Sequence, residues 1–101
     1  MNKVFDFLDS KRINYITDFR KEMAYIGQYP KDIRISKNDI DYHKDNHPHT
    51  GKFYYRISWI EWNKTDMEHA QVYTFNEAKK VILNAMKELD MFKDGYQLKL
   101  F

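Results

Sequence analysis

The sequence contains no cysteine, which excludes three kinds of chemistry at once. Without thiols the chain cannot build a disulfide framework, bind zinc through thiolates or attack a substrate with a cysteine nucleophile. The composition agrees with a reducing compartment, so we expect a cytoplasmic protein. No apolar run approaches the roughly 20 residues that a membrane-spanning helix needs, and Asp6 and Asp9 interrupt the one apolar stretch near the N-terminus, so we expect no membrane partner.

Glycine is scarce as well, since the chain has only three, and this argues against the glycine-rich loops that hold phosphates. The sequence also lacks an H-E-x-x-H motif, and none of Ser10, Ser36 and Ser58 lies in a G-x-S-x-G motif. We therefore expect no enzyme activity and no cofactor.

Aromatic residues are abundant instead, at 17% of the chain, and apolar residues make up 43%. This composition predicts a folded chain with an aromatic-rich core, and 101 residues suffice for one domain spanning 1–101. The net charge is only +2, and the two signs are interspersed along the chain. A nucleic-acid-binding protein usually carries a basic stripe, so charge favours nucleic acid only weakly.

The first part of the chain reads as helical. Its apolar residues recur mostly at steps of three and four: Phe5, Leu8, Ile13, Ile16, Phe19, Met23 and Ile26. The pattern predicts helix from 3 to 26, ended by Gly27. The step of five from Leu8 to Ile13, with Asp9 and Ser10 between, leaves two alternatives, one long helix or a short helix followed by a longer one, and we favour the second.

Strand patterns follow. Ile33 and Ile35 alternate with polar residues, as do Ile40 and Tyr42 on the opposite parity, which predicts a bulge or turn across 36–38. Residues 43–51 read as a loop, 52–62 as the clearest strand and 69–75 as its antiparallel partner after a turn at 63–66.

The last part of the chain predicts a helix and a final strand. Thr74 and Glu77 fit a capping box before an apolar stripe made of Ala78, Val81, Ile82, Ala85, Met86, Leu89 and Phe92. Gly95 ends this helix, and residues 96–100 alternate as a strand. The predicted fold is a two-layer α+β domain of order α-β-β-β-α-β, with a mainly antiparallel four-stranded sheet and helices packed on one face.

The strand at 52–62 has two different faces. Phe53, Tyr55, Ile57 and Trp59 form the more apolar face, which should meet the helices. The other face carries aromatic and arginine side chains, the residue types that dominate protein-binding hot spots. If both helices cover the first face, the second is open, and its predicted partner-binding residues are Tyr54, Arg56, Ile60 and Trp62.

Other uses of that face stay open. The N-terminal helix could cover it, or two copies of the chain could pair there as a homodimer. The same aromatic residues could stack the bases of single-stranded nucleic acid. A third class of function comes from the loop, where His43, His47 and His49 supply ligand chemistry for a metal ion, although their spacing and Pro48 favour an ordinary solvated loop.

These observations favour a small non-enzymatic protein-binding module whose partner is a host macromolecule, in first place a protein. Small proteins of phages and mobile elements often inhibit a host nuclease or defence enzyme, as anti-CRISPR proteins do. This analogy of size and composition suggests an inhibitor with an anti-defence role.

Overall fold

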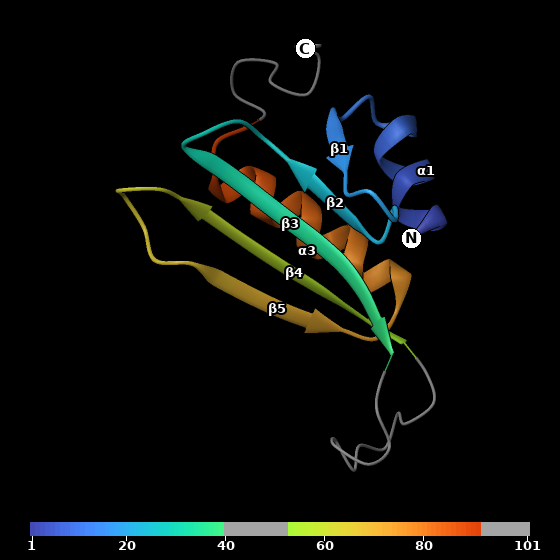
Figure 1. Ribbon diagram of the computed structural model, residues 1–101. Helices are drawn as coiled ribbons and strands as arrows, with labels where there is room; N and C mark the ends of the chain where they lie inside the picture. Colours follow the sequence, from blue (N-terminus) through green and yellow to red (C-terminus); the bar gives the residue numbers. More distant parts are fainter. Residues whose placement is uncertain (40–52, 92–101) are drawn as a thin grey trace.

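The computed structural model describes residues 1–39 and 53–91, which form one five-stranded sheet and two helices (Figure 1). The elements follow in the order α1 (Asn2–Ser10), β1 (Tyr15–Thr17), β2 (Met23–Ile26), β3 (Lys31–Asp39), β4 (Phe53–Glu61), β5 (Glu68–Val72) and α3 (Phe75–Glu88). Each strand pairs antiparallel with the next one in the sequence, so the spatial order is β1-β2-β3-β4-β5. The α+β class of the sequence-based prediction is confirmed.

Both helices pack on one face of the sheet. α3 lies behind the strands in Figure 1 and contacts β4, β5 and α1. Val4 and Leu8 of α1 belong to the same buried cluster as Ile82 and Met86 of α3. The sheet supplies the other side of this cluster through Ala24, Ile26, Ile33, Ile35, Tyr55, Ile57 and Trp59. Among residues 1–39 and 53–91, therefore, no helix lies on the other face of the sheet.

The pairing of β3 with β4 decides which side chains enter the core. Ile33 lies opposite Trp59, and Ile35 lies opposite Ile57. Side chains of a strand alternate between the two faces, so the residues between these pairs point away from the helices. Ile33, Ile35 and Ile57 have no exposed surface, in agreement with a fully covered face.

The predicted helix over 3–26 is wrong beyond Ser10, because the chain leaves the helix through a left-handed residue. Arg12 has φ 55°, the N–H of Ile13 donates to the carbonyl of Leu8 at 2.9 Å, and the N–H of Arg12 donates to the carbonyl of Asp9 at 3.0 Å. These two hydrogen bonds form a Schellman motif, in which an apolar contact joins the third-last helical residue to the second residue beyond the cap. The step of five from Leu8 to Ile13 is the spacing of that contact.

Residues 15–26 form a hairpin instead of a helix. The Asp18 carboxylate accepts from the backbone N–H groups of Glu22 and Met23 at 2.7 and 3.0 Å, which holds the turn between β1 and β2. Ala24 and Ile26 are buried, whereas Ile16 is 70% exposed and Phe19 is 98% exposed. A helix would have placed Ile16, Phe19 and Ile26 on one face, whereas the hairpin buries Ile26 and leaves the other two exposed.

The number of strands and their order therefore differ from the prediction. β1 and β2 arise inside the predicted helix, which gives five strands where four were expected. The predicted bulge at 36–38 is also wrong, since β3 pairs with β4 without interruption from Lys31 to Asp39. The expected strand residues Ile40 and Tyr42 and the expected strand at 96–100 lie outside the described residues.

The predicted start of the helix after β5 is confirmed, whereas the predicted end at Gly95 is wrong, because α3 ends at Glu88 and the chain turns at Asp90 with φ 60°. Thr74 is the N-cap of α3, and its hydroxyl oxygen accepts from the Glu77 N–H at 3.2 Å. The Glu77 carboxylate accepts from the Thr74 hydroxyl at 2.9 Å and not from a backbone N–H. Near the other end of α3, the Trp59 indole N–H donates to Glu88 at 2.6 Å and ties the helix to β4.

Within the described ranges, neither helix has the length and apolar character needed to cross a bilayer.

The turn after β2 generates a prediction about backbone strain. Gly27 has φ 100°, and a Cβ atom there would lie 2.6 Å from the carbonyl oxygen of Lys31. We expect Gly27→Ala to lower the free energy of unfolding by more than about 1 kcal/mol, measured by urea denaturation. The control is Lys21→Gly, at φ 56°, which should change stability by less than about 0.5 kcal/mol. Equal losses in both variants would contradict this explanation.

Candidate functional site

The sheet face opposite the helices is the candidate site, and we call it the open face. The strand register assigns to it Ile16, Met23, Tyr25, Asp32, Arg34, Ser36, Asn38, Tyr54, Arg56, Ser58, Ile60, His69 and Gln71. Trp62 follows the same parity one residue beyond β4. The face is thus rich in hydroxyl, amide and guanidinium groups, with apolar side chains among them.

A hollow of about 260 Å³ lies at the middle of the open face. It is lined by Met23, Arg34, Ser36, Asn38, Tyr54, Arg56 and Ser58, which come from β2, β3 and β4. The register explains this grouping, since Ser36 lies opposite Arg56 and next to Met23 of the neighbouring strand. Two guanidinium groups therefore border one concave surface.

The two arginines of the hollow differ in their partners. Arg34 donates from Nε and Nη2 to the same oxygen of Asp32, at 3.2 and 3.0 Å. Arg56 is exposed and forms no ion pair with any carboxylate in the ranges 1–39 and 53–91. The charge of Arg34 is thus largely balanced by Asp32. A ligand that binds the Arg56 guanidinium does not have to break an ion pair within the described residues, so Arg56 is the more available of the two.

Hydrogen bonds between neighbours hold the polar side chains of the open face. The Asn38 amide donates to the Ser36 hydroxyl at 3.0 Å, and the Ser58 hydroxyl lies 3.1 Å from Nδ1 of His69. The Tyr25 hydroxyl donates to the sulfur of Met23 at 3.4 Å. Side chains that are already ordered lose less conformational entropy when a partner binds, so the face is partly preorganised.

The structure brings three of the four predicted partner-binding residues to an accessible surface. Tyr54 is half-buried and Arg56 is exposed, and both line the hollow. Trp62 is 38% exposed, and its backbone N–H donates to the carbonyl of Pro30 at 2.8 Å. Ile60 is only 8% exposed, although it lies outside the main core cluster. Ile60 therefore has little surface to offer a partner.

The predicted helix-side face of the same strand agrees with the structure in its central part. Tyr55 and Trp59 are 7% and 8% exposed, and Ile57 is fully buried. Phe53, at the first position of β4, is 50% exposed. Alternation was therefore sufficient to separate the two faces of β4.

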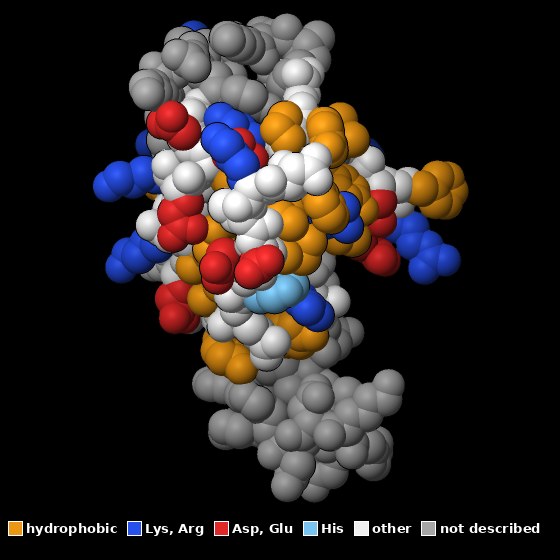
Figure 2. Space-filling model, turned by 90° about the vertical axis from the view of Figure 1, so that its left-hand side faces the viewer, with side chains coloured by type: hydrophobic (Ala, Val, Ile, Leu, Met, Phe, Trp, Pro, Cys, Tyr) orange, Lys and Arg blue, Asp and Glu red, His pale blue; other side chains and the backbone are white. Residues whose placement is uncertain are grey.

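Figure 2 shows where charged and hydrophobic side chains lie on one face of the molecule. Charged side chains of both signs cover one side of this view, and hydrophobic side chains gather toward the other side. Within the described ranges, the exposed large apolar residues are Ile16, Phe19, Tyr29, Phe53 and Trp62. Ile16 and Trp62 belong to the open face but are not among the residues that line the hollow.

The sequence-based prediction missed the residues that β2 and β3 contribute. Met23 and Tyr25 were assigned to a helix, and Arg34 and Ser36 were not considered as site residues. The signal for β2 was the alternation of Ala24 and Ile26, but the step of three from Met23 to Ile26 fits a helix as well. Arg34 could have been found, because it lies between the two buried isoleucines of β3.

The metal hypothesis is not addressed by the structure, since His43, His47 and His49 lie outside the described residues. Among residues 1–39 and 53–91 there is no group of three or more His, Cys, Asp or Glu side chains that could hold a metal ion.

Comparisons with protein families, with curated proteins and with solved structures found no match for this chain. The chemistry of the surface is thus the basis on which function is proposed.

Two adjacent tyrosines give a direct test of the two faces of β4. Tyr55 is buried under the helices, so Tyr55→Ala should lower the free energy of unfolding by about 3–5 kcal/mol. Tyr54 points to the open face, and Tyr54→Ala should cost no more than about 1 kcal/mol. Chemical denaturation of both variants measures the difference. Similar losses would mean that the open face is covered in solution.

Proposed function

We propose that this chain is a non-enzymatic binding module and that a partner protein docks on its open face. The observation that carries the proposal is a sheet face that no described helix covers and that bears a partly preorganised hollow with an accessible arginine. Tyrosine, tryptophan and arginine are the side chains most often responsible for affinity at protein interfaces. Tyr54, Trp62 and Arg56 bring all three types to this face.

The chemistry of the hollow indicates what the partner presents. A carboxylate of the partner can form two parallel hydrogen bonds with Arg56, which is the strongest polar contact available on this face. The side chains of Met23 and Tyr54, which line the same hollow, can then contact apolar side chains around that carboxylate. We therefore expect the partner segment to carry an aspartate or glutamate flanked by hydrophobic residues.

An inhibitory role toward a host nuclease or defence enzyme fits this mode of action. A small domain inhibits an enzyme by occupying a surface that the enzyme needs, and it requires no catalytic groups of its own. The size and mixed charge of the chain support this part of the proposal only by analogy with small phage and mobile-element proteins. A cytoplasmic location belongs to the same proposal.

Single-stranded nucleic acid is the second candidate, and a specific observation favours it. Arg34 and Arg56 border the same hollow as the Tyr54 ring, so a stacked base and a phosphate could be held together there. The Asp32 carboxylate beside Arg34 and the net charge of +2 weaken this alternative, because phosphate neutralisation supplies much of the affinity for nucleic acids.

The decisive experiment compares three versions of the chain as bait for host proteins: the wild type, Trp62→Ala with Arg56→Ala, and the control Lys80→Ala on α3. We expect a host protein to be retained by the wild type and the control. The open-face variant should bind it at least about 30-fold more weakly, as loss of hot-spot side chains implies. Its melting temperature should stay close to that of the wild type, since both side chains are accessible.

Three other outcomes would contradict docking of a protein. Unfolding of Trp62→Ala would place this side chain in the core. Salt-dependent binding of oligonucleotides that is lost in Tyr54→Ala would favour nucleic acid. A dimer that dissociates in the Trp62→Ala variant, measured by light scattering, would identify a second copy of the chain as the occupant.

A further inference from the structure

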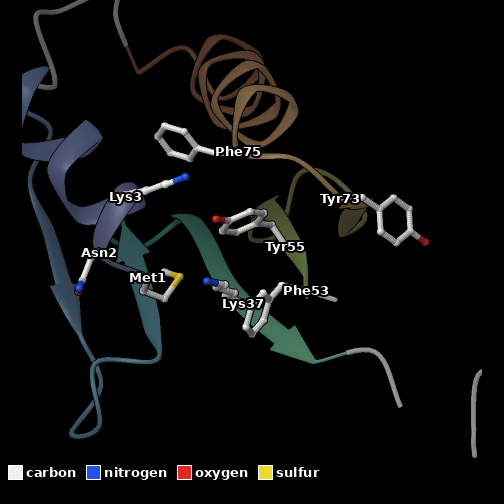
Figure 3. A pocket seen from close by; sticks show the side chains of 8 residues that line it. All are labelled: Met1, Asn2, Lys3, Lys37, Phe53, Tyr55, Tyr73 and Phe75. Atoms are coloured by element: carbon white, nitrogen blue, oxygen red, sulfur yellow. The ribbon is translucent and has the colours of Figure 1, made fainter. Parts of the chain in front are cut away.

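A second concave site lies on the helix side of the sheet, where α1 and α3 begin (Figure 3). The pocket has a volume of about 580 Å³, which is within the usual range for small-molecule sites. It is lined by Met1, Asn2, Lys3, Lys37, Phe53, Tyr55, Tyr73 and Phe75. These residues come from four separate parts of the chain, so the pocket is a product of the tertiary fold.

The described lining is positively charged. Lys3 and Lys37 contribute two ammonium groups, and no aspartate or glutamate is among the described lining residues. Neither lysine forms an ion pair with a carboxylate in the described part of the chain. Lys37 Nζ instead lies 3.9 Å from the centre of the Phe53 ring. The site therefore favours an anion.

The Tyr55 side chain is a second observation, independent of the lysines, that points to a ligand in this pocket. Its side chain is 7% exposed, and its hydroxyl forms no hydrogen bond with another residue of the described ranges. Figure 3 shows this hydroxyl pointing into the space toward which Lys3 and Lys37 also extend, whereas the Tyr73 ring is turned away. A buried polar group without a partner is costly, so a ligand that accepts its hydrogen bond gains affinity. Burial raises the pKa of Tyr55, which keeps the hydroxyl protonated.

The pocket also has aromatic walls and two helix N-termini. Phe53 and Phe75 lie on either side of the Tyr55 ring in Figure 3 and can contact a flat apolar group. α1 begins at Asn2 without a side-chain cap and has no acidic residue in its first turn. The N-terminus of a helix carries partial positive charge and free N–H groups, which add to the attraction for a phosphate.

We infer that this pocket binds a small phosphate monoester that carries an aromatic group, with the phosphate held by Lys3, Lys37 and the Tyr55 hydroxyl and the aromatic group placed against Phe53 and Phe75. The site does not depend on the open face, since the two lie on opposite sides of the sheet. Failure of one proposal therefore leaves the other unaffected.

The test is an NMR titration of the full chain with adenosine monophosphate as the probe, and with adenosine and inorganic phosphate as its two parts. We expect adenosine monophosphate to shift the amide signals of Phe53, Tyr55 and Phe75 and to leave unchanged those of open-face residues on strands away from the pocket, such as Ile16 and Tyr25. Lys37→Gln should raise the dissociation constant about tenfold, since it removes a charge-assisted hydrogen bond. Tyr55→Phe keeps the buried ring and should raise it about fivefold.

Two lysine variants complete the design. Lys3→Gln changes an exposed residue of α1, so its effect on binding is measured in a folded protein. Lys80→Gln removes the same charge from a part of α3 outside the pocket and should leave affinity within about twofold. The proposal is overturned if pocket signals do not move at millimolar probe, if adenosine binds as tightly as its phosphate, if inorganic phosphate alone binds as tightly as the ester, or if Lys80→Gln weakens binding as much as Lys37→Gln.

Discussion

The pairing of β3 with β4 is the constraint on which the rest of the molecule depends. One set of alternating side chains is apolar and fully buried, as in Ile33, Ile35 and Ile57, and this set must be covered by α1 and α3. The other set contains arginine, serine and asparagine, and it is compatible with water or with a partner. A slip of one residue would exchange the two sets, so the burial of the isoleucines also fixes the position of Arg56 and Tyr54.

The sequence correctly predicted those elements whose apolar residues fit only one period, either that of a strand or that of a helix. β4 is long and rich in aromatic and β-branched residues, and α3 has a capped N-terminus and a continuous apolar stripe. The apolar residues between 13 and 26 do not have a single unambiguous period. Their apolar spacing fits a helix, and the features that prevent one are a left-handed residue at Arg12 and an aspartate-centred turn at Asp18. Neither residue type marks such a position reliably in a sequence, since arginine rarely adopts positive φ.

The candidate sites show the same limit. Tyr54, Arg56 and Trp62 were accessible to prediction because they belong to a single strand whose period was clear. Ile60 shares that period, and its burial depends on neighbours that no local pattern specifies. The pocket at the start of the helices is lined by Lys3, Lys37, Tyr55 and Phe75, and no pattern in the sequence relates these four residues to one another. Sites made by one element can be predicted from its pattern, whereas sites made by several elements need the tertiary arrangement.

The neighbour-to-neighbour order of the strands has a consequence for how the chain reaches this structure. Every strand pairs with the strand that precedes or follows it, so the ladder can grow hairpin by hairpin with little loss of entropy from closing long loops. The contact between α1 and α3 joins the two ends of this ladder and spans the greatest separation in sequence. Closing the core between the two helices is therefore the step that unites local hairpins into one cooperative unit.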